Sequence, residues 1–338
     1  MHPSSPPQRV FVTGATGFIG TRLAGELART GHTVVALCRS SSDRTGLAHE
    51  KIESIEGDVC DVPSLERGMR GCTQLYHLAA YAKNWARRKS RFHEVNVEGT
   101  RNVVAAARSA GIERVVCTST IVTFGPTGPR GLGDEATQRA TPTFFTEYEE
   151  TKALAEREAL DCAARGLPLV IVNPTRVYGP GKLTEGNSVT LMVDQYDRGR
   201  VPVLLNRGAN VGNYVYIDDV VRGHILAMEK GSSGDRYILG GENVSLAQLF
   251  RTVDAVSGRR HFQVSLPPVI ARLYARKERF VAERFGLYPR ITPGWVDTFL
   301  HDWVYSSARA ARELGYTITP LAEGMRRTYE WLIRRRRK

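Results

Sequence analysis

The chain has 338 residues, and 42% of them are hydrophobic, which is enough for one large domain or two fused lobes. Its net charge is +12, but no nucleic-acid-binding module accompanies the charge, so no nucleic-acid partner is expected. No run approaches the roughly 18 apolar residues of a membrane span. Five scattered cysteines without a C-x-x-C pair indicate neither a disulfide framework nor a metal site. The expected location is the cytoplasm.

The start of the chain carries a glycine-rich turn. Residues 1–8 are rich in Pro and Ser and are expected to be disordered, neither a signal peptide nor an anchor. An apolar run then leads into Gly14, Gly17 and Gly20, after which apolar residues recur every four positions, as in a helix. Glycines let the backbone approach a ligand closely, and a helix N-terminus attracts anions. The spacing G-x-x-G-x-x-G has one residue more than the common dinucleotide pattern. The turn therefore predicts a phosphate cradle.

The first half of the chain alternates strand-like and helical segments, which predicts an α/β fold with a doubly wound parallel sheet of the Rossmann type. Strands are expected at 10–13, 34–38, 75–79, 115–118 and 169–173, with helices such as 103–109 and 152–164 between them. We expect residues 9–181 to form the dinucleotide-binding domain, to which 213–240 return. Residues 182–212 and 241–333 would form a smaller, mostly helical substrate lobe, and 334–338 a basic tail.

The ends of the second and third strands carry the candidate adenosine contacts. The second strand ends at Arg39 and a run of serines, where an acidic residue would select NAD. A guanidinium there suits a 2′-phosphate, so NADP is favoured and NAD is possible. The alternative is that Arg39 stacks on adenine or faces solvent. Asp58 could accept a hydrogen bond from adenine or cap the next helix. His77 is expected to be a packed histidine.

A second group of polar residues suits proton transfer. Tyr148 and Lys152 lie four residues apart at the start of a helix and so share one face. A neighbouring ammonium favours the phenolate and lowers the pKa of a tyrosine, which would let it exchange a proton with a carbonyl or alcohol oxygen. Ser119 and Thr120 end the fifth strand, and strand alternation allows only one of them to face the site.

Taken in order, these motifs resemble one known family. They are the glycine turn, Asp58, 77–80, Asn96 with 97–100, 119–120, Tyr148-x-x-x-Lys152 and 173–180. Together they resemble the extended short-chain dehydrogenase/reductase superfamily, of the NAD(P)-dependent epimerase/dehydratase type, over residues 9–332. The segments 39–40 and 234–243 resemble its dihydroflavonol-4-reductase-like branch, and 234–243 also resembles the hopanoid-associated sugar epimerase group.

The resemblance implies roles for individual residues. Tyr148 would be the general acid/base, Lys152 its electrostatic partner and a ribose ligand, and Thr120 the hydroxyl that orients the substrate. Asn96 would be a structural asparagine, unless it is a helix N-cap. The cofactor would contact Gly14, Thr16, Gly17, Phe18, Ile19, Arg39, Asp58, Val59, Leu78, Ala79, Ala80, Thr118, Tyr148, Lys152, Pro174, Thr175 and Val177. The resemblance also implies a homodimer, because members of this family commonly form one.

The expected activity is an NADP(H)-dependent oxidoreductase that moves a hydride between nicotinamide and a ketone, aldehyde or alcohol of a fairly apolar substrate. One alternative is a nucleotide-sugar epimerase or dehydratase with tightly bound cofactor, in which Arg200, Arg207 or Arg222 would hold a diphosphate. Others are a 3β-hydroxysteroid-dehydrogenase-like enzyme and a non-catalytic, cofactor-sensing protein. The apolar segments 270–274 and 280–288 could line a pocket, form lobe core or lie on a membrane surface, although membrane contact is not expected.

Overall fold

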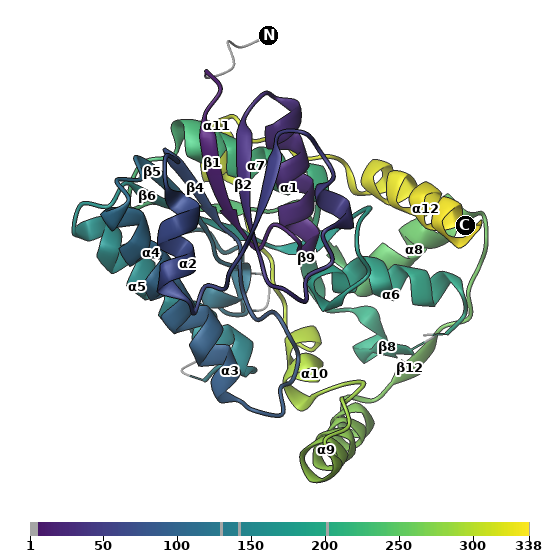
Figure 1. Ribbon diagram of the computed structural model, residues 1–338. Coiled ribbons are helices and arrows are strands. Elements are labelled where there is room, and N and C mark those ends of the chain that lie inside the picture. The colour runs from purple at the N-terminus through teal and green to yellow at the C-terminus, as the bar shows by residue number, and fades with distance from the viewer. Residues whose placement is uncertain (1–5, 129–130, 141–142, 201–202, 338) are drawn as a thin grey trace.

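The computed structural model describes residues 6–128, 131–140, 143–200 and 203–337. At its centre lies a seven-stranded parallel sheet in the order β10-β6-β5-β4-β1-β2-β3 (Figure 1). The strands are β1 (Arg9–Thr13), β2 (Thr33–Cys38), β3 (Ile52–Glu56), β4 (Gln74–His77), β5 (Arg114–Thr118), β6 (Leu169–Pro174) and β10 (Arg236–Leu239). The order reverses direction between β1 and β4, and ligands of such sheets bind at this switch point. The predicted doubly wound sheet is confirmed.

Helices cover both faces of the sheet because the strands are apolar on both sides. The core of one face joins β1 through Val10 and Val12 to α1 (Phe18–Arg29), α7 (Ile217–Lys230) and α11 (Ala308–Leu314). The other core joins Phe11 to α2 (Val62–Met69), α4 (Gly99–Ser109) and α5 (Glu147–Ala164). The five expected strands and both expected helices occur, with ends displaced by at most five residues. α11 packs against the large sheet, although its residues were expected in the lobe, because Ala310 and Leu314 are buried there.

Apart from α3 (Ser90–His93), which lies beside α5, the remaining helices and strands form the smaller lobe beside the carboxyl ends of the strands (Figure 1). It contains a three-stranded sheet, β11-β9-β7, and a two-stranded sheet, β12-β8. Its elements are β7 (Arg176–Tyr178), β8 (Val203–Leu205), β9 (Val211–Tyr216), β11 (Glu242–Ser245), β12 (Val264–Leu266), α6 (Ser188–Asp197), α8 (Leu246–Ser257), α9 (Pro268–Phe285), α10 (Pro293–Phe299) and α12 (Leu321–Arg337). No helix in the described ranges is long and apolar enough to cross a membrane.

The basic C-terminal segment is part of this lobe. α12 continues to Arg337, and the guanidinium of Arg336 contacts two acidic residues of α6. Its Nη2 lies 2.7 Å from Asp194 Oδ1, and its Nη1 lies 2.5 Å from Asp197 Oδ2. The Asp197 side chain is fully buried, so Arg336 neutralises a carboxylate that water does not reach.

We predict that Arg336→Ala destabilises the protein by about 2–4 kcal/mol, because it leaves the buried Asp197 carboxylate without its cation. Urea denaturation measures the change in the free energy of unfolding. The matched control is Arg337→Ala, an exposed neighbour that should change this free energy by less than about 0.5 kcal/mol. Equal effects of the two substitutions would contradict the assignment.

Candidate active site

The glycine turn between β1 and α1 is shaped for close approach. Gly14 has φ +72°, and a Cβ there would lie 2.7 Å from the backbone of Leu78 and Ala79. A Cβ on Gly20 would lie 2.1 Å from the Gly14 carbonyl oxygen. Gly17 is the N-cap of α1 and supplies no capping side chain, so the first N–H groups of the helix lack a side-chain acceptor. Such a turn fits the pyrophosphate of a dinucleotide.

Arg39 stands at the far end of this pocket, after β2. Its side chain is exposed, lines the pocket, and makes no ion pair or side-chain hydrogen bond among the described residues. The other lining cations are engaged. Lys83 pairs with Glu185 and Arg91 with Glu94, the guanidinium of Arg176 contacts Tyr214 and Thr298, and the ammonium of Lys152 donates to the Thr118 carbonyl oxygen. Arg39 is therefore the cation most available to an incoming anion.

Asp58 follows the end of β3, and His77 is the last residue of β4. The Asp58 carboxylate lines the pocket and accepts a hydrogen bond from the Cys60 N–H at 2.9 Å, while Asp61 occupies the N-cap of α2. The capping alternative for Asp58 is therefore wrong. His77 is buried, with its ring nitrogens 2.7 Å from Thr13 Oγ1 and 3.1 Å from Thr100 Oγ1. Burial lowers its pKa to about 3, so it is the packed histidine that was expected.

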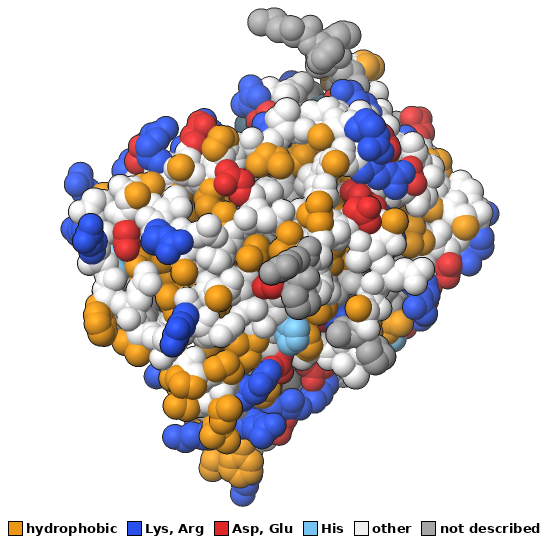
Figure 2. Space-filling view, turned by 180° about the vertical axis from the view of Figure 1, so that it is seen from behind, with side chains coloured by type: hydrophobic (Ala, Val, Ile, Leu, Met, Phe, Trp, Pro, Cys, Tyr) orange, Lys and Arg blue, Asp and Glu red, His pale blue; other side chains and the backbone are white. Residues whose placement is uncertain are grey.

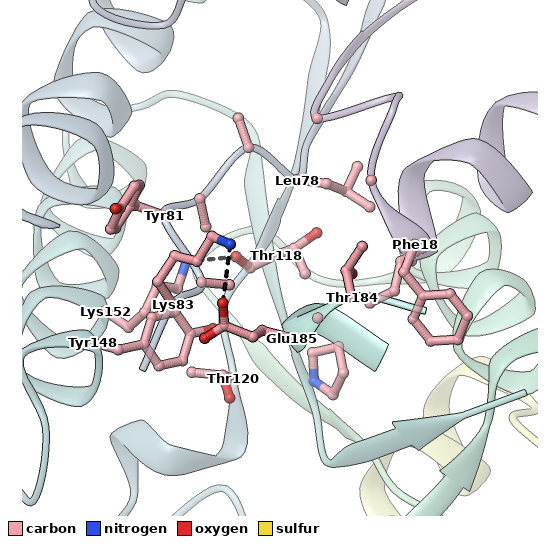
Figure 3. Close-up of a pocket in the computed structure, with 18 of the residues that line it drawn as sticks. Phe18, Leu78, Tyr81, Lys83, Thr118, Thr120, Tyr148, Lys152, Thr184 and Glu185 are labelled. Atoms are coloured by element: carbon pink, nitrogen blue, oxygen red, sulfur yellow. Dashed lines mark hydrogen bonds and ion pairs between the residues drawn. The ribbon is translucent and has the colours of Figure 1, made fainter. Parts of the chain in front are cut away.

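Tyr148, Lys152 and Thr120 lie together on one side of the pocket, across from Phe18 and Leu78 (Figure 3). Tyr148 is in the first turn of α5, where Thr146 caps the helix by accepting from the Glu149 N–H. Lys152 follows one turn later and is buried, and its Nζ donates to the Thr118 carbonyl oxygen at 2.9 Å.

The pKa of Tyr148 moves in the opposite direction to the expected one. Burial raises it to about 12, the hydrogen bond with Thr120 lowers it in part, and the nearby Glu149 carboxylate raises it further. Lys152 does not offset this shift, because its ammonium is directed to Thr118, and burial lowers its own pKa. The phenol is therefore protonated at neutral pH.

The side chains of the two hydroxyl residues that follow β5 point in different directions. Ser119 is buried, and its hydroxyl donates to the Glu156 carboxylate inside the protein. Thr120 is the next residue in an extended backbone, so its side chain points the other way, toward Tyr148. Both residues line the pocket, but the Ser119 hydroxyl is engaged by Glu156, so the Thr120 hydroxyl is the one available to a ligand.

Asn96 joins two helices behind the site. It lies within a π-helical segment, η2 (Glu94–Glu98), and is not a helix N-cap. Its side chain donates to Thr151 Oγ1 at 2.9 Å and accepts from the Tyr81 N–H at 2.7 Å. Asn96 therefore holds the loop after β4 against α5, next to Lys152.

The other end of the pocket has an aromatic wall. The pocket encloses about 710 Å³, and α10 contributes Trp295 and Phe299 to its lining, with Trp303 beyond. Thr298 of α10 donates to Glu149 at 3.3 Å, which places this wall beside the start of α5. The apolar segments 270–274 and 280–288 do not line the pocket.

All of the predicted catalytic and cofactor residues line this one pocket. Sequence reasoning missed its aromatic wall, although the Pro293–Gly294 helix start followed by Trp295 is a local signal. It also missed the pair Lys83–Glu185 at 2.9 Å, in which Glu185 accepts from the Asn84 N–H as well. Arg200, Arg207 and Arg222, the expected diphosphate ligands, are not among the lining residues.

Comparisons with known proteins agree with this geometry. The pattern that defines the "NAD dependent epimerase/dehydratase family" matches residues 10–240. A protein of Synechocystis sp. named as a candidate dihydroflavonol 4-reductase is 32% identical, covering 95% of this chain and 93% of its own. The 2-alkyl-3-oxoalkanoate reductase of Stenotrophomonas maltophilia is 30% identical, covering 94% and 98%.

Among solved structures, that of gox2253 aligns with a TM-score of 0.81 and 32% identity, covering 97% of this chain and 98% of its own. The match therefore includes the lobe as well as the large sheet. The chain belongs to the NAD-dependent epimerase/dehydratase family of extended short-chain dehydrogenases/reductases, enzymes that use NAD(P) and act on CH–OH groups.

Proposed function

We propose that this enzyme is an NADP(H)-dependent oxidoreductase whose substrate is a ketone or aldehyde, or the corresponding alcohol, on a fairly apolar body. The observation that carries the proposal is the aromatic wall of Trp295, Phe299 and Trp303 beside the Tyr148 end of the pocket. Such a wall favours apolar ligands, because burying their surface against aromatic rings releases water. The names of the Synechocystis and Stenotrophomonas relatives point the same way.

The proposed proton transfer uses groups already in place. When bound, the nicotinamide would supply or accept the hydride. Tyr148 holds its proton at neutral pH and would donate it to the substrate oxygen as the carbonyl is reduced. The Thr120 hydroxyl would bind the same oxygen and fix its distance from the phenol. Lys152, whose ammonium contacts the Thr118 carbonyl in this structure, would turn toward the phenolate that remains in order to stabilise it, and would contact the cofactor ribose.

The preference for NADP rests on Arg39. The residue stands where an acidic side chain would bind the ribose hydroxyls of NAD, and it is the lining cation without a partner in the described part of the chain. A 2′-phosphate would supply that partner through charge-assisted hydrogen bonds.

A nucleotide-sugar epimerase is the second candidate, favoured by the family that the chain belongs to. Arg200, Arg207 and Arg222 do not line the pocket, and Lys83, Arg91 and Arg176, which do, already have partners. This weighs against the epimerase, because a sugar diphosphate needs available cations at the substrate end. Purified protein that carries oxidised cofactor, and that gives no net turnover of added NADPH, would support the epimerase.

The proposed function is tested with a panel of aliphatic, cyclic and aromatic ketones and aldehydes. Consumption of NADPH is followed by its absorbance, with NADH in parallel and UDP-sugars as competitors. We expect turnover to increase with the apolar surface of the carbonyl compound. Turnover of UDP-sugars alone would overturn the proposal.

We predict that Tyr148→Phe lowers kcat by about 10²–10⁴-fold, because the ring stays in place while the transferable proton is lost. Steady-state kinetics with the best carbonyl substrate measures the effect. Tyr329→Phe removes a phenolic hydroxyl on α12, outside the pocket, and should leave kcat unchanged. A fully active Tyr148→Phe enzyme would exclude the assigned role.

Substitutions of the two hydroxyl residues that follow β5 should have different effects, one on kcat and the other on the free energy of unfolding. We expect Thr120→Val to lower kcat roughly 10²-fold, because a donor to the reacting oxygen is lost, and Thr120→Ser to keep most of the activity. Ser119→Ala should instead lower the free energy of unfolding by about 1–3 kcal/mol, because Glu156 loses a buried donor. A loss of kcat in Ser119→Ala, together with a loss of stability alone in Thr120→Val, would instead assign the substrate hydroxyl to Ser119.

For the cofactor, Arg39→Ala should raise KM for NADPH by about tenfold to a hundredfold and leave KM for NADH nearly unchanged, since only NADPH carries the 2′-phosphate. Initial rates with each cofactor provide the measurement. Arg70→Ala, an exposed arginine outside the pocket, serves as the matched control. Equal changes for both cofactors would remove the proposed role of Arg39.

A further inference from the structure

The helix α9 projects from the smaller lobe and leaves most of its surface without a partner (Figure 1). It is held through small side chains: Ala271 and Ala275 are buried in a cluster with Leu205 of β8 and Val296 of α10. Ala282 is the other buried residue of the helix. A helix that packs through alanines comes close to its neighbours and leaves its larger residues outside.

The outward side of α9 is apolar to an unusual degree. Val269, Ile270, Leu273, Tyr274, Phe280 and Phe285 are between 42% and 66% exposed. At 100° per residue, they lie on the side of the helix opposite to or flanking the buried alanines. Hydrophobic side chains gather at this tip of the molecule, with Lys and Arg side chains around them (Figure 2). The sequence left open whether this segment forms lobe core. Its alanines do, whereas the exposure of its large apolar side chains excludes that interpretation for them.

The charge of α9 indicates what could cover this face. The helix carries five Lys or Arg residues against two Glu. Arg272 pairs with Asp297 and Arg279 with Glu283, whereas Arg276, Lys277 and Arg284 make no ion pair within the described residues. At 100° per residue, Arg276, Lys277 and Arg284 lie among the exposed apolar residues on the outward side of the helix. This face therefore combines apolar area with positive charge, and an anionic bilayer surface attracts both. A second copy of this face would bring like charges together.

We propose that the outward face of α9 docks on the surface of a bilayer that contains anionic lipid. The apolar side chains would enter the boundary between headgroups and acyl chains. Arg276, Lys277 and Arg284 would extend their stems along the helix and place their charges at the lipid phosphates. The helix would lie on the membrane and not cross it.

The docked helix adjoins the rim of the pocket. Gly286 ends α9, and Tyr288 follows with its hydroxyl donating to Glu185, a lining residue, at 2.6 Å. The Tyr288 ring also packs edge-on against Trp85 at 5.7 Å. Docking would therefore bring the pocket close to the bilayer, where apolar carbonyl compounds partition. This last consequence rests on the proposed function, whereas the docking does not.

The test is flotation of the full-length protein with vesicles of phosphatidylcholine alone and with about one quarter phosphatidylglycerol. We expect binding to the anionic vesicles that weakens between about 0.1 M and 1 M salt, as the Debye length falls from about 10 Å to about 3 Å. Leu273→Ser with Phe280→Ser should weaken binding about tenfold or more, because two apolar anchors are lost. Arg276→Gln with Lys277→Gln should remove most of the preference for anionic lipid.

Two controls make the test specific to α9. Leu132→Ser alters an exposed leucine away from the helix, and Arg334→Gln with Arg335→Gln removes cations of the exposed C-terminal segment; both proteins should bind like the unaltered chain. Thermal unfolding confirms that each variant is folded. No binding to either vesicle, binding abolished only by the Arg334 and Arg335 changes, or an α9-dependent dimer in sedimentation velocity would each overturn the docking. Carbonyl turnover without vesicles tests the proposed function separately.

Discussion

The arrangement of the active site depends on one buried carboxylate, that of Glu156. Its Oε2 accepts from the Ser119 hydroxyl, from Thr123 at 3.0 Å and from the Asn173 amide at 2.8 Å, and its Oε1 lies 3.1 Å from the Arg236 guanidinium. A carboxylate removed from water is tolerated only when a cation and several donors offset its desolvation. Because these donors come from the ends of β5, β6 and β10, satisfying Glu156 fixes three strands against α5.

The face of α5 that results carries the proposed chemistry. Glu156, Lys152 and Tyr148 follow one another at intervals of four residues, so a fixed position for the first determines the other two. Holding Ser119 inward also turns its neighbour Thr120 outward, into the pocket. The tyrosine and the threonine are thus placed by a group that itself has no contact with the pocket.

The sequence predicts the parts of this site that depend on local spacing. The glycine turn, the interval from Tyr148 to Lys152 and the alternation at β5 are read directly from neighbouring residues. The aromatic wall comes from residues 295–303, far along the chain from Tyr148. The partners of Glu156 come from separate elements, 17 to 80 residues away from it, and no local pattern states that they meet. The pKa of Tyr148 was predicted with the wrong sign for the same reason. Desolvation depends on everything that packs around the phenol, whereas sequence spacing shows only Lys152.

The neighbouring helices α9 and α10 show how one short stretch of the chain can contribute to two different surfaces. α9 and α10 pack on each other through Ala271, Ala275 and Val296, small or branched residues that bring the two helices close. Trp295 and Phe299 of α10 pack against this cluster and also line the pocket, while the large aromatic residues of α9 are exposed. Hydrophobicity alone does not predict which residue lines the pocket and which is exposed, because Phe299 and Phe280 have the same side chain. In α9 the face that packs on the lobe carries Ala271 and Ala275, so the large residues of this helix are left outside.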